Sequence, residues 1–67
     1  MSNIKYSRHA RMRMVERGIS EREVSEAINK GSKRRKGKEI IAAHRHIEVI
    51  FKVANKEFYV ITVMLRW

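Results

Sequence analysis

The sequence has no cysteine among its 67 residues, few acidic side chains and no long apolar run. Without cysteine, neither a disulfide nor a thiolate-ligated metal can stabilise the fold. No apolar stretch approaches the roughly 20 residues that a membrane-spanning helix needs, and the first residues lack the apolar core of a signal peptide. We therefore expect a cytoplasmic protein whose fold depends on side-chain packing and that does not contact a membrane.

The length limits the chain to one thin hydrophobic core, so we expect a single domain over residues 1–67. A domain of this size is only marginally stable alone. Self-association or a bound partner chain would add the missing stability.

Positive charge is the dominant global feature. Sixteen Lys and Arg against seven Asp and Glu give a formal net charge of +9. Such an excess indicates a nucleic acid, an acidic protein or an anionic surface as partner. Solubility alone is the simpler alternative, and the charge does not choose among these partners.

The first predicted helix begins after Ser7, a candidate N-cap, and runs to about Arg17. Four polar residues of this helix share a sector of about 100° on a helical wheel: His9, Arg13, Glu16 and Arg17. Ala10 and Met14 lie beside this polar sector, and the apolar stripe of the helix is poorly defined. The sector is either a solvated face with ion pairs one turn apart or a cluster that binds phosphate or carboxylate.

The second predicted helix runs from about residue 21 to residue 30. Ser20 with Glu23 three residues later forms a capping box at its start. Glycines follow both helices, at Gly18 and Gly31, where a left-handed C′ residue is favoured. The apolar residues of the second helix have the spacing of a scaffold helix: Val24, Ala27 and Ile28.

Residues 32–38 read Ser-Lys-Arg-Arg-Lys-Gly-Lys and form the strongest basic run. We expect a mobile loop with a turn at Gly37. Cations on such a loop suit salt-sensitive, sequence-independent phosphate contacts; they are Lys33, Arg34, Arg35, Lys36 and Lys38. A solvated connector is the alternative.

From Glu39 onward the sequence predicts strands, since its apolar residues become continuous and then alternate. We expect strands over 39–43, about 46–53 and 58–67, with a hairpin loop over 54–57. After an extended lead-in, the expected fold is α+β: two N-terminal helices packed on one face of a small antiparallel meander of three strands, with room for a short fourth.

A symmetric hairpin about Asn55 and Lys56 predicts the register of the last two strands. The pairs expected under the helices are Val53–Phe58, Phe51–Val60, Val49–Thr62 and Ile47–Met64. The pairs expected on the other face are Lys52–Tyr59, Ile50–Ile61, Glu48–Val63, His46–Leu65 and His44–Trp67. A slip of one residue would exchange the two sets. Apolar residues on both faces of the last strand indicate that it is central or covered, and they favour a homodimer through this strand.

Two helices followed by a meander, in a short basic chain, are similar to the toxins of the RelE/ParE-like superfamily. The stretch from His9 to Ser20 resembles the signature HAxxRMxERGIS of an uncharacterised branch, a domain of unknown function. The resemblance covers nearly the whole chain and implies a toxin-like fold with an antitoxin protein as partner. RelE-like members cut messenger RNA in the ribosome without a metal, whereas ParE-like members act on gyrase.

Ribonucleolytic chemistry of the RelE type needs a base, a phosphate-binding cation and an acid. His44 and His46 are candidates for base or acid because imidazole titrates near neutral pH. Arg45 and Arg66 are candidates for holding the phosphate, and Tyr59 for donating a proton or stacking on a base. Further candidates for binding nucleic acid come from the last hairpin and the first helix: Lys52, Arg13, Arg17 and His9.

We expect no cofactor. A zinc site made of His9, His44 and His46 is an alternative, with Glu48 as the only acidic residue nearby that could orient the rings. Two classes of function stay open. The protein is either a toxin-like endoribonuclease, with or without the ribosome, or a non-enzymatic basic module that binds nucleic acid or protein and self-associates.

Overall fold

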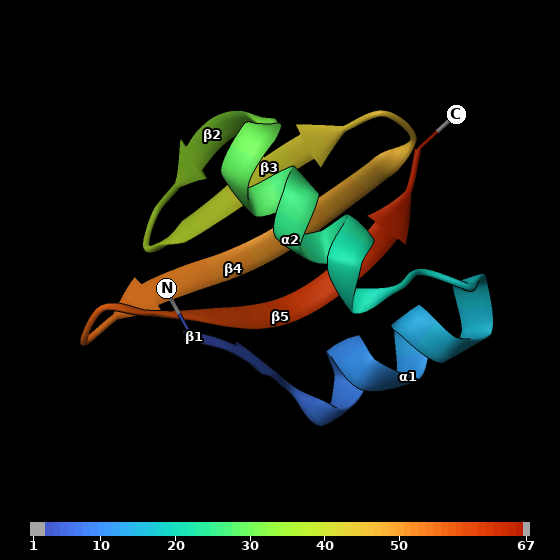
Figure 1. Ribbon diagram of the computed structural model, residues 1–67. Helices are drawn as coiled ribbons and strands as arrows, with labels where there is room; N and C mark the ends of the chain where they lie inside the picture. Colours follow the sequence, from blue (N-terminus) through green and yellow to red (C-terminus); the bar gives the residue numbers. More distant parts are fainter. Residues whose placement is uncertain (1–2, 67) are drawn as a thin grey trace.

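The computed structural model describes residues 3–66, which form a five-stranded sheet with two helices (Figure 1). The elements in chain order are β1 (Asn3–Tyr6), α1 (Arg8–Arg17), α2 (Glu21–Lys30), β2 (Ser32–Lys36), β3 (Glu39–His44), β4 (Ile47–Ala54) and β5 (Glu57–Leu65). Their order in the sheet is β1-β5-β4-β3-β2. The predicted α+β class is confirmed, but the sheet is mixed because β1 pairs parallel with β5.

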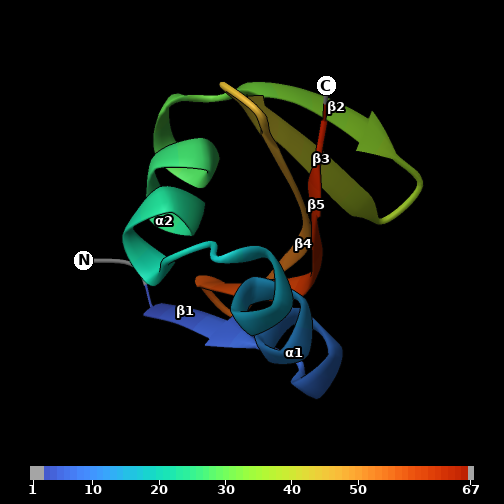
Figure 2. The same ribbon diagram turned by 90° about the vertical axis from the view of Figure 1, so that its right-hand side faces the viewer.

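Both helices lie on the same side of the sheet, which curves around them (Figure 2). The helix α1 packs against β5 and β1, and α2 packs against β3 and β4. In the part of the chain that the structure describes, no helix covers the opposite side. We call this side the open face.

The predicted start of each helix is confirmed by its hydrogen bonds. The hydroxyl of Ser7 accepts from the N–H of Ala10 at 2.9 Å. The hydroxyl of Ser20 accepts from the N–H of Glu23 at 3.1 Å, and the Glu23 carboxylate accepts from the N–H of Ser20 at 2.9 Å. These reciprocal bonds satisfy N–H groups that a helix start otherwise leaves without partners.

Of the two glycines, Gly18 has the predicted left-handed conformation, with φ 66°. The prediction for Gly31 is wrong, since its φ of −73° and ψ of 162° are extended. Glycine is needed there for close approach: a Cβ on Gly31 would lie 2.5 Å from the Ala27 carbonyl oxygen and 2.7 Å from that of Ala43.

The predicted basic loop is instead largely an edge strand. The strand β2 pairs antiparallel with β3, from Ser32 opposite Ala43 to Lys36 opposite Glu39. The chain reverses at Gly37, whose φ is 63°. Lys and Arg are unusual in central strands, and for this reason the sequence did not predict β2. On an exposed edge they discourage pairing with the edge strand of another molecule.

The register of β4 and β5 is as predicted only from the hairpin to the pair Phe51–Val60. Beyond it the ladder shifts by one residue, because Ile61 is an extra residue in β5. The wrong pairs are Val49–Thr62, Ile47–Met64, Ile50–Ile61, Glu48–Val63 and His46–Leu65; the pair His44–Trp67 reaches outside the described residues. Val63 is consequently fully buried under the helices, whereas Met64 is exposed on the open face.

The start of α1 fixes this bulge. Ser7 donates its N–H to the carbonyl of Val60 at 3.0 Å and its hydroxyl to the carbonyl of Ile61 at 2.7 Å. The same side chain therefore caps the helix and binds the irregular part of β5, a contact that hairpin symmetry cannot anticipate.

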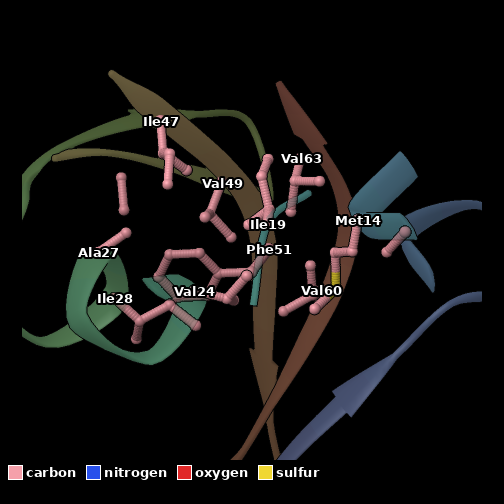
Figure 3. Packing of buried hydrophobic residues seen from close by; sticks show 12 residues of the cluster. Met14, Ile19, Val24, Ala27, Ile28, Ile47, Val49, Phe51, Val60 and Val63 are labelled. Atoms are coloured by element: carbon pink, nitrogen blue, oxygen red, sulfur yellow. The ribbon is translucent and has the colours of Figure 1, made fainter. Parts of the chain in front are cut away.

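A single cluster of buried side chains joins the helices to the sheet (Figure 3). Phe51 lies in its middle and makes an edge-to-face contact with Phe58, with 5.7 Å between ring centroids. The cluster consists of Ala10, Met14, Ile19, Val24, Ala27, Ile28, Ala42, Ile47, Val49, Phe51, Val60 and Val63. From α1 it takes only Ala10 and Met14, while Val15 is 83% exposed.

Candidate nucleic-acid interface

The open face carries three rows of side chains that run across the strands. The tyrosine row consists of Lys52, Tyr59 and Lys5. The middle row consists of Arg34, Ile41, Ile50 and Thr62. The glutamate row consists of Ser32, Ala43, Glu48 and Met64. Adjacent strands lie about 4.8 Å apart and side chains on one face repeat every two residues, so successive rows are about 7 Å apart.

The centre of the open face is apolar. Ile41 and Ile50 are half-buried and lie outside the core cluster, and Met64 is 39% exposed. Contiguous apolar surface bordered by charge is typical of an interaction site.

Arg34 of the edge strand lines two shallow depressions beside this apolar centre. One of about 340 Å³ is also lined by Ser32, Ala43, Glu48 and Arg66. The other, of about 260 Å³, is also lined by Arg35, Lys36 and Ile41. A guanidinium group that borders two depressions can donate hydrogen bonds to an anion bound in either one.

The five cations predicted as one loop are divided by the pleat of β2. Arg34 and Lys36 alternate onto the open face, whereas Lys33 and Arg35 alternate toward the helical side. Lys33 donates from Nζ to the carbonyl of Gly31 at 3.0 Å, and Lys38 lies in the turn after β2. Only part of the basic run therefore borders the open face.

The turn between β3 and β4 brings together three predicted catalytic residues, His44, Arg45 and His46. They line a hollow of about 60 Å³ with Glu23 and Glu26 of α2. The prediction that both histidines share the open face is wrong, because His44 pairs with the core-facing Ile47 and His46 belongs to the turn. The prediction that Glu48 is the only nearby acid is also wrong, since packing of α2 on the sheet supplies two others.

Arg45 adopts a left-handed backbone conformation in this turn, with φ 57°. Such a φ is unfavourable for a residue with a Cβ. Across the hollow, the pKa of Glu23 is lowered, first by its hydrogen bonds to Ser20 and then by electrostatic interaction with His46 and Arg45. The turn and the start of α2 are therefore electrostatically coupled.

The other two predicted catalytic residues lie at opposite ends of the open face. Arg66 donates its N–H to the carbonyl of His46 at 2.8 Å, so its backbone adjoins the turn. Its Nε lies 3.6 Å from a carboxylate oxygen of Glu48. Tyr59 precedes Arg66 by seven residues, about 20 Å along a strand. The structure therefore places four of the five candidates near the turn and Tyr59 elsewhere.

The predicted polar sector of α1 forms a separate surface on the helical layer. Arg13 Nε contacts His9 Nε2 at 3.5 Å, and Arg13 Nη1 lies 3.7 Å from a carboxylate oxygen of Glu16. Arg17 is exposed at the end of the helix. Of the predicted nucleic-acid candidates outside the basic run, only Lys52 lies on the open face.

Lys5 and the acids of the hollow are residues that the sequence reasoning missed. Ile4 and Tyr6 pack against the core, which leaves Lys5 between them on the open face. This alternation in the lead-in was the available signal for β1. Glu23 and Glu26 had no such signal, because their approach to the turn is purely tertiary.

Among residues 3–66, no group of three or more His, Asp or Glu side chains is arranged to hold a metal ion. Neither described helix combines the length and apolar composition that crossing a bilayer requires.

Comparison with protein families matches residues 6–65 to a family described as a domain of unknown function, DUF4258. Comparisons with curated proteins and with solved structures gave no match. The matched segment begins at the end of β1, includes both helices and reaches the last residue of β5. It therefore contains the core, the turn hollow and most of the open face, and the chain belongs to the DUF4258 family.

Proposed function

We propose that this protein is a toxin-like, RNA-directed domain that holds RNA against the open face of its sheet. The observation that carries the proposal is a sheet face without a helical cover, apolar at its centre and bordered by Arg34 and Lys36. The net charge of +9 would attract a polyanion to the protein, and Arg34 and Lys36 would contact it beside this surface.

The choice of RNA, and of an antitoxin chain as regulator, comes from the resemblance to RelE-like toxins. The element order agrees with that resemblance, since two helices lie on one face of an antiparallel hairpin series. Single-stranded RNA suits an open sheet because its bases are free to contact side chains.

Binding is tested by titrating labelled single-stranded RNA with the protein over a range of salt concentrations. We expect binding that weakens steeply with salt, as phosphate contacts require. Arg34→Ala should weaken binding about equally for all sequences and reduce the salt dependence by about one ion. Arg22→Ala on α2 removes the same charge from the helical side and should have a much smaller effect. Equal effects of both substitutions on RNA affinity would contradict the proposal that RNA binds to the open face.

A second candidate activity, metal-independent RNA cleavage, is favoured by the residues of the β3–β4 turn. In this reaction a base removes the proton of a ribose 2′-hydroxyl, whose oxygen attacks the adjacent phosphorus. The P–O5′ bond breaks and an acid protonates the departing oxygen, leaving a 2′,3′-cyclic phosphate. His44 and His46 would serve as base and acid, and Arg45 would stabilise the negative charge of the transition state.

Cleavage is tested on RNA, both free and ribosome-bound, with His46→Ala and Arg45→Ala variants. We expect both variants to lose at least 100-fold in rate while circular dichroism shows an unchanged fold. Cleavage that persists in both variants would remove the turn from the mechanism. Binding without cleavage in wild type would leave the RNA-binding proposal standing alone.

A further inference from the structure

We propose that the tyrosine row is a base-stacking site for single-stranded RNA, with Tyr59 as the platform and Lys5 and Lys52 as phosphate contacts on either side. The inference rests on the proposed function and deepens it. It names the subsite that binds RNA and specifies that the RNA is single-stranded, neither of which follows from net charge.

The geometry of the row follows from the sheet register. Tyr59 lies opposite Lys52 on β4 and is also the register partner of Lys5 on the parallel strand β1. All three residues alternate with core-facing neighbours, so their side chains share the open face. With a strand spacing of about 4.8 Å, the two lysine backbones lie about 10 Å apart with the tyrosine between them.

The tyrosine ring is available to a ligand. Tyr59 is 46% exposed, and it makes no ring contact with the other described aromatic residues. Packing of the core does not account for this side chain, which alternates away from the core-facing Phe58 and Val60. A flat ring on an open sheet is the feature on which single-stranded bases stack, largely without regard to sequence.

The charges beside the ring favour phosphate. Lys52 is exposed, and the ammonium group of Lys5 lies 3.9 Å from a carboxylate oxygen of Glu57. That pair is exposed on both sides, and exposed pairs at such distances contribute little. A phosphate can therefore displace Glu57 from Lys5 at little cost.

The row also continues into the rest of the open face. Ile50 and Thr62 lie about 7 Å farther along their strands, and Arg34 borders the same middle row. An RNA strand stacked on Tyr59 would cross this apolar centre and place later phosphates beside Arg34. A site of about four nucleotides or more fits this span.

The experiment measures dissociation constants of wild type, Tyr59→Phe, Tyr59→Ala and a Lys5→Ala/Lys52→Ala double variant. The probes are an oligouridylate of eight nucleotides and an abasic oligomer of the same length. Tyr59→Ala should weaken binding of oligouridylate by roughly 10-fold or more and leave binding of the abasic oligomer unchanged. Tyr59→Phe should bind both probes as wild type does. The double lysine variant should weaken binding of both probes.

Controls separate this inference from the proposed function. A Lys30→Ala/Arg22→Ala variant removes two charges from α2 and should retain most binding. If wild type binds oligouridylate and Tyr59→Ala binds it equally well, the stacking site is wrong while the RNA-binding proposal stands. If wild type binds neither probe, both proposals are wrong. If Tyr59→Ala weakens binding of both probes equally, the ring positions the two lysines and does not stack on a base. The stacking site is then also wrong.

Discussion

The carboxylate of Glu48 lies 3.6 Å from the guanidinium Nε of Arg66, and this pair borders the depression that Arg34 lines. Glu48 is the more enclosed partner, with 20% of its side chain exposed against 51% for Arg66. The open face therefore carries an anion within its cationic border, and Arg66 neutralises it.

Replacing Glu48 with Gln should strengthen RNA binding, because Arg66 is then free to contact phosphate. We expect a several-fold lower dissociation constant and a salt dependence that is steeper by about one ion. Glu16→Gln, which removes a carboxylate beside Arg13 on α1, is the matched control and should change binding less. An unchanged or weaker affinity for Glu48→Gln would indicate that RNA does not approach this depression.

The two helix-ending glycines should respond differently to alanine. In Gly31→Ala the new Cβ would meet backbone oxygens of Ala27 and Ala43, so we expect a loss of about 2–3 kcal/mol in the free energy of unfolding. A Cβ on Gly18 would meet nothing within 4 Å beyond its chain neighbours, and Gly18→Ala should cost only about 1 kcal/mol for its left-handed backbone. Urea denaturation measures the free energy of unfolding of both variants. Equal losses in the two variants would contradict this prediction.

The capping box of α2 should make stability depend on pH. The pKa of Glu23 is lowered from its ordinary value of 4.5 by hydrogen bonds to Ser20 and then by His46 and Arg45. The folded-state pKa is thus below the unfolded one, and the ionised carboxylate stabilises the fold above about pH 4.5. This contribution is lost as the pH falls through the folded-state value.

Glu23→Gln keeps the cap hydrogen bond but removes the titration. Wild type should be more stable than this variant at pH 7, and the difference should shrink as the pH falls below about 4.5 and through the lowered folded-state pKa of Glu23. Urea midpoints measured at several pH values test this. A difference that is constant with pH would show that charge does not contribute at this cap.

The strained turn predicts a separation of stability from activity. The φ of 57° at residue 45 is unfavourable for Arg, as it is for any residue with a Cβ. Arg45→Gly should raise the free energy of unfolding by up to about 1 kcal/mol relative to Arg45→Ala, and both should lose RNA cleavage. Thermal denaturation compares the two. A less stable glycine variant would mean that the turn does not store strain.

Local signals in the sequence were sufficient for three of the four helix ends, whereas Gly31 is required by its approach to Ala43. Ser7, Ser20 and Gly18 determine these three ends through contacts within a few residues, and the structure confirms all three. The hairpin at Asn55 and Lys56 is also local, since positive φ at both residues, 51° and 63°, gives a turn compatible with strand twist.

Features that depend on distant contacts were not predictable. The bulge at Ile61 is bound by Ser7, which is 54 residues away in the chain, and it exchanges the faces of every later residue in β5. The acids beside His44 and His46 come from a helix that packs there only in the folded state. The open face was therefore predicted correctly near the hairpin, at Lys52 and Tyr59, and incorrectly toward the turn.

The basic edge strand also has a consequence for the protein in concentrated solution. The outer side of β2 presents unpaired backbone groups, and repulsion between its lysines and arginines keeps two such edges apart. A polyanion that neutralises these side chains removes that repulsion while leaving the backbone groups available. Colloidal stability of the protein should therefore be lowest near charge equivalence with RNA and should recover when either component is in excess.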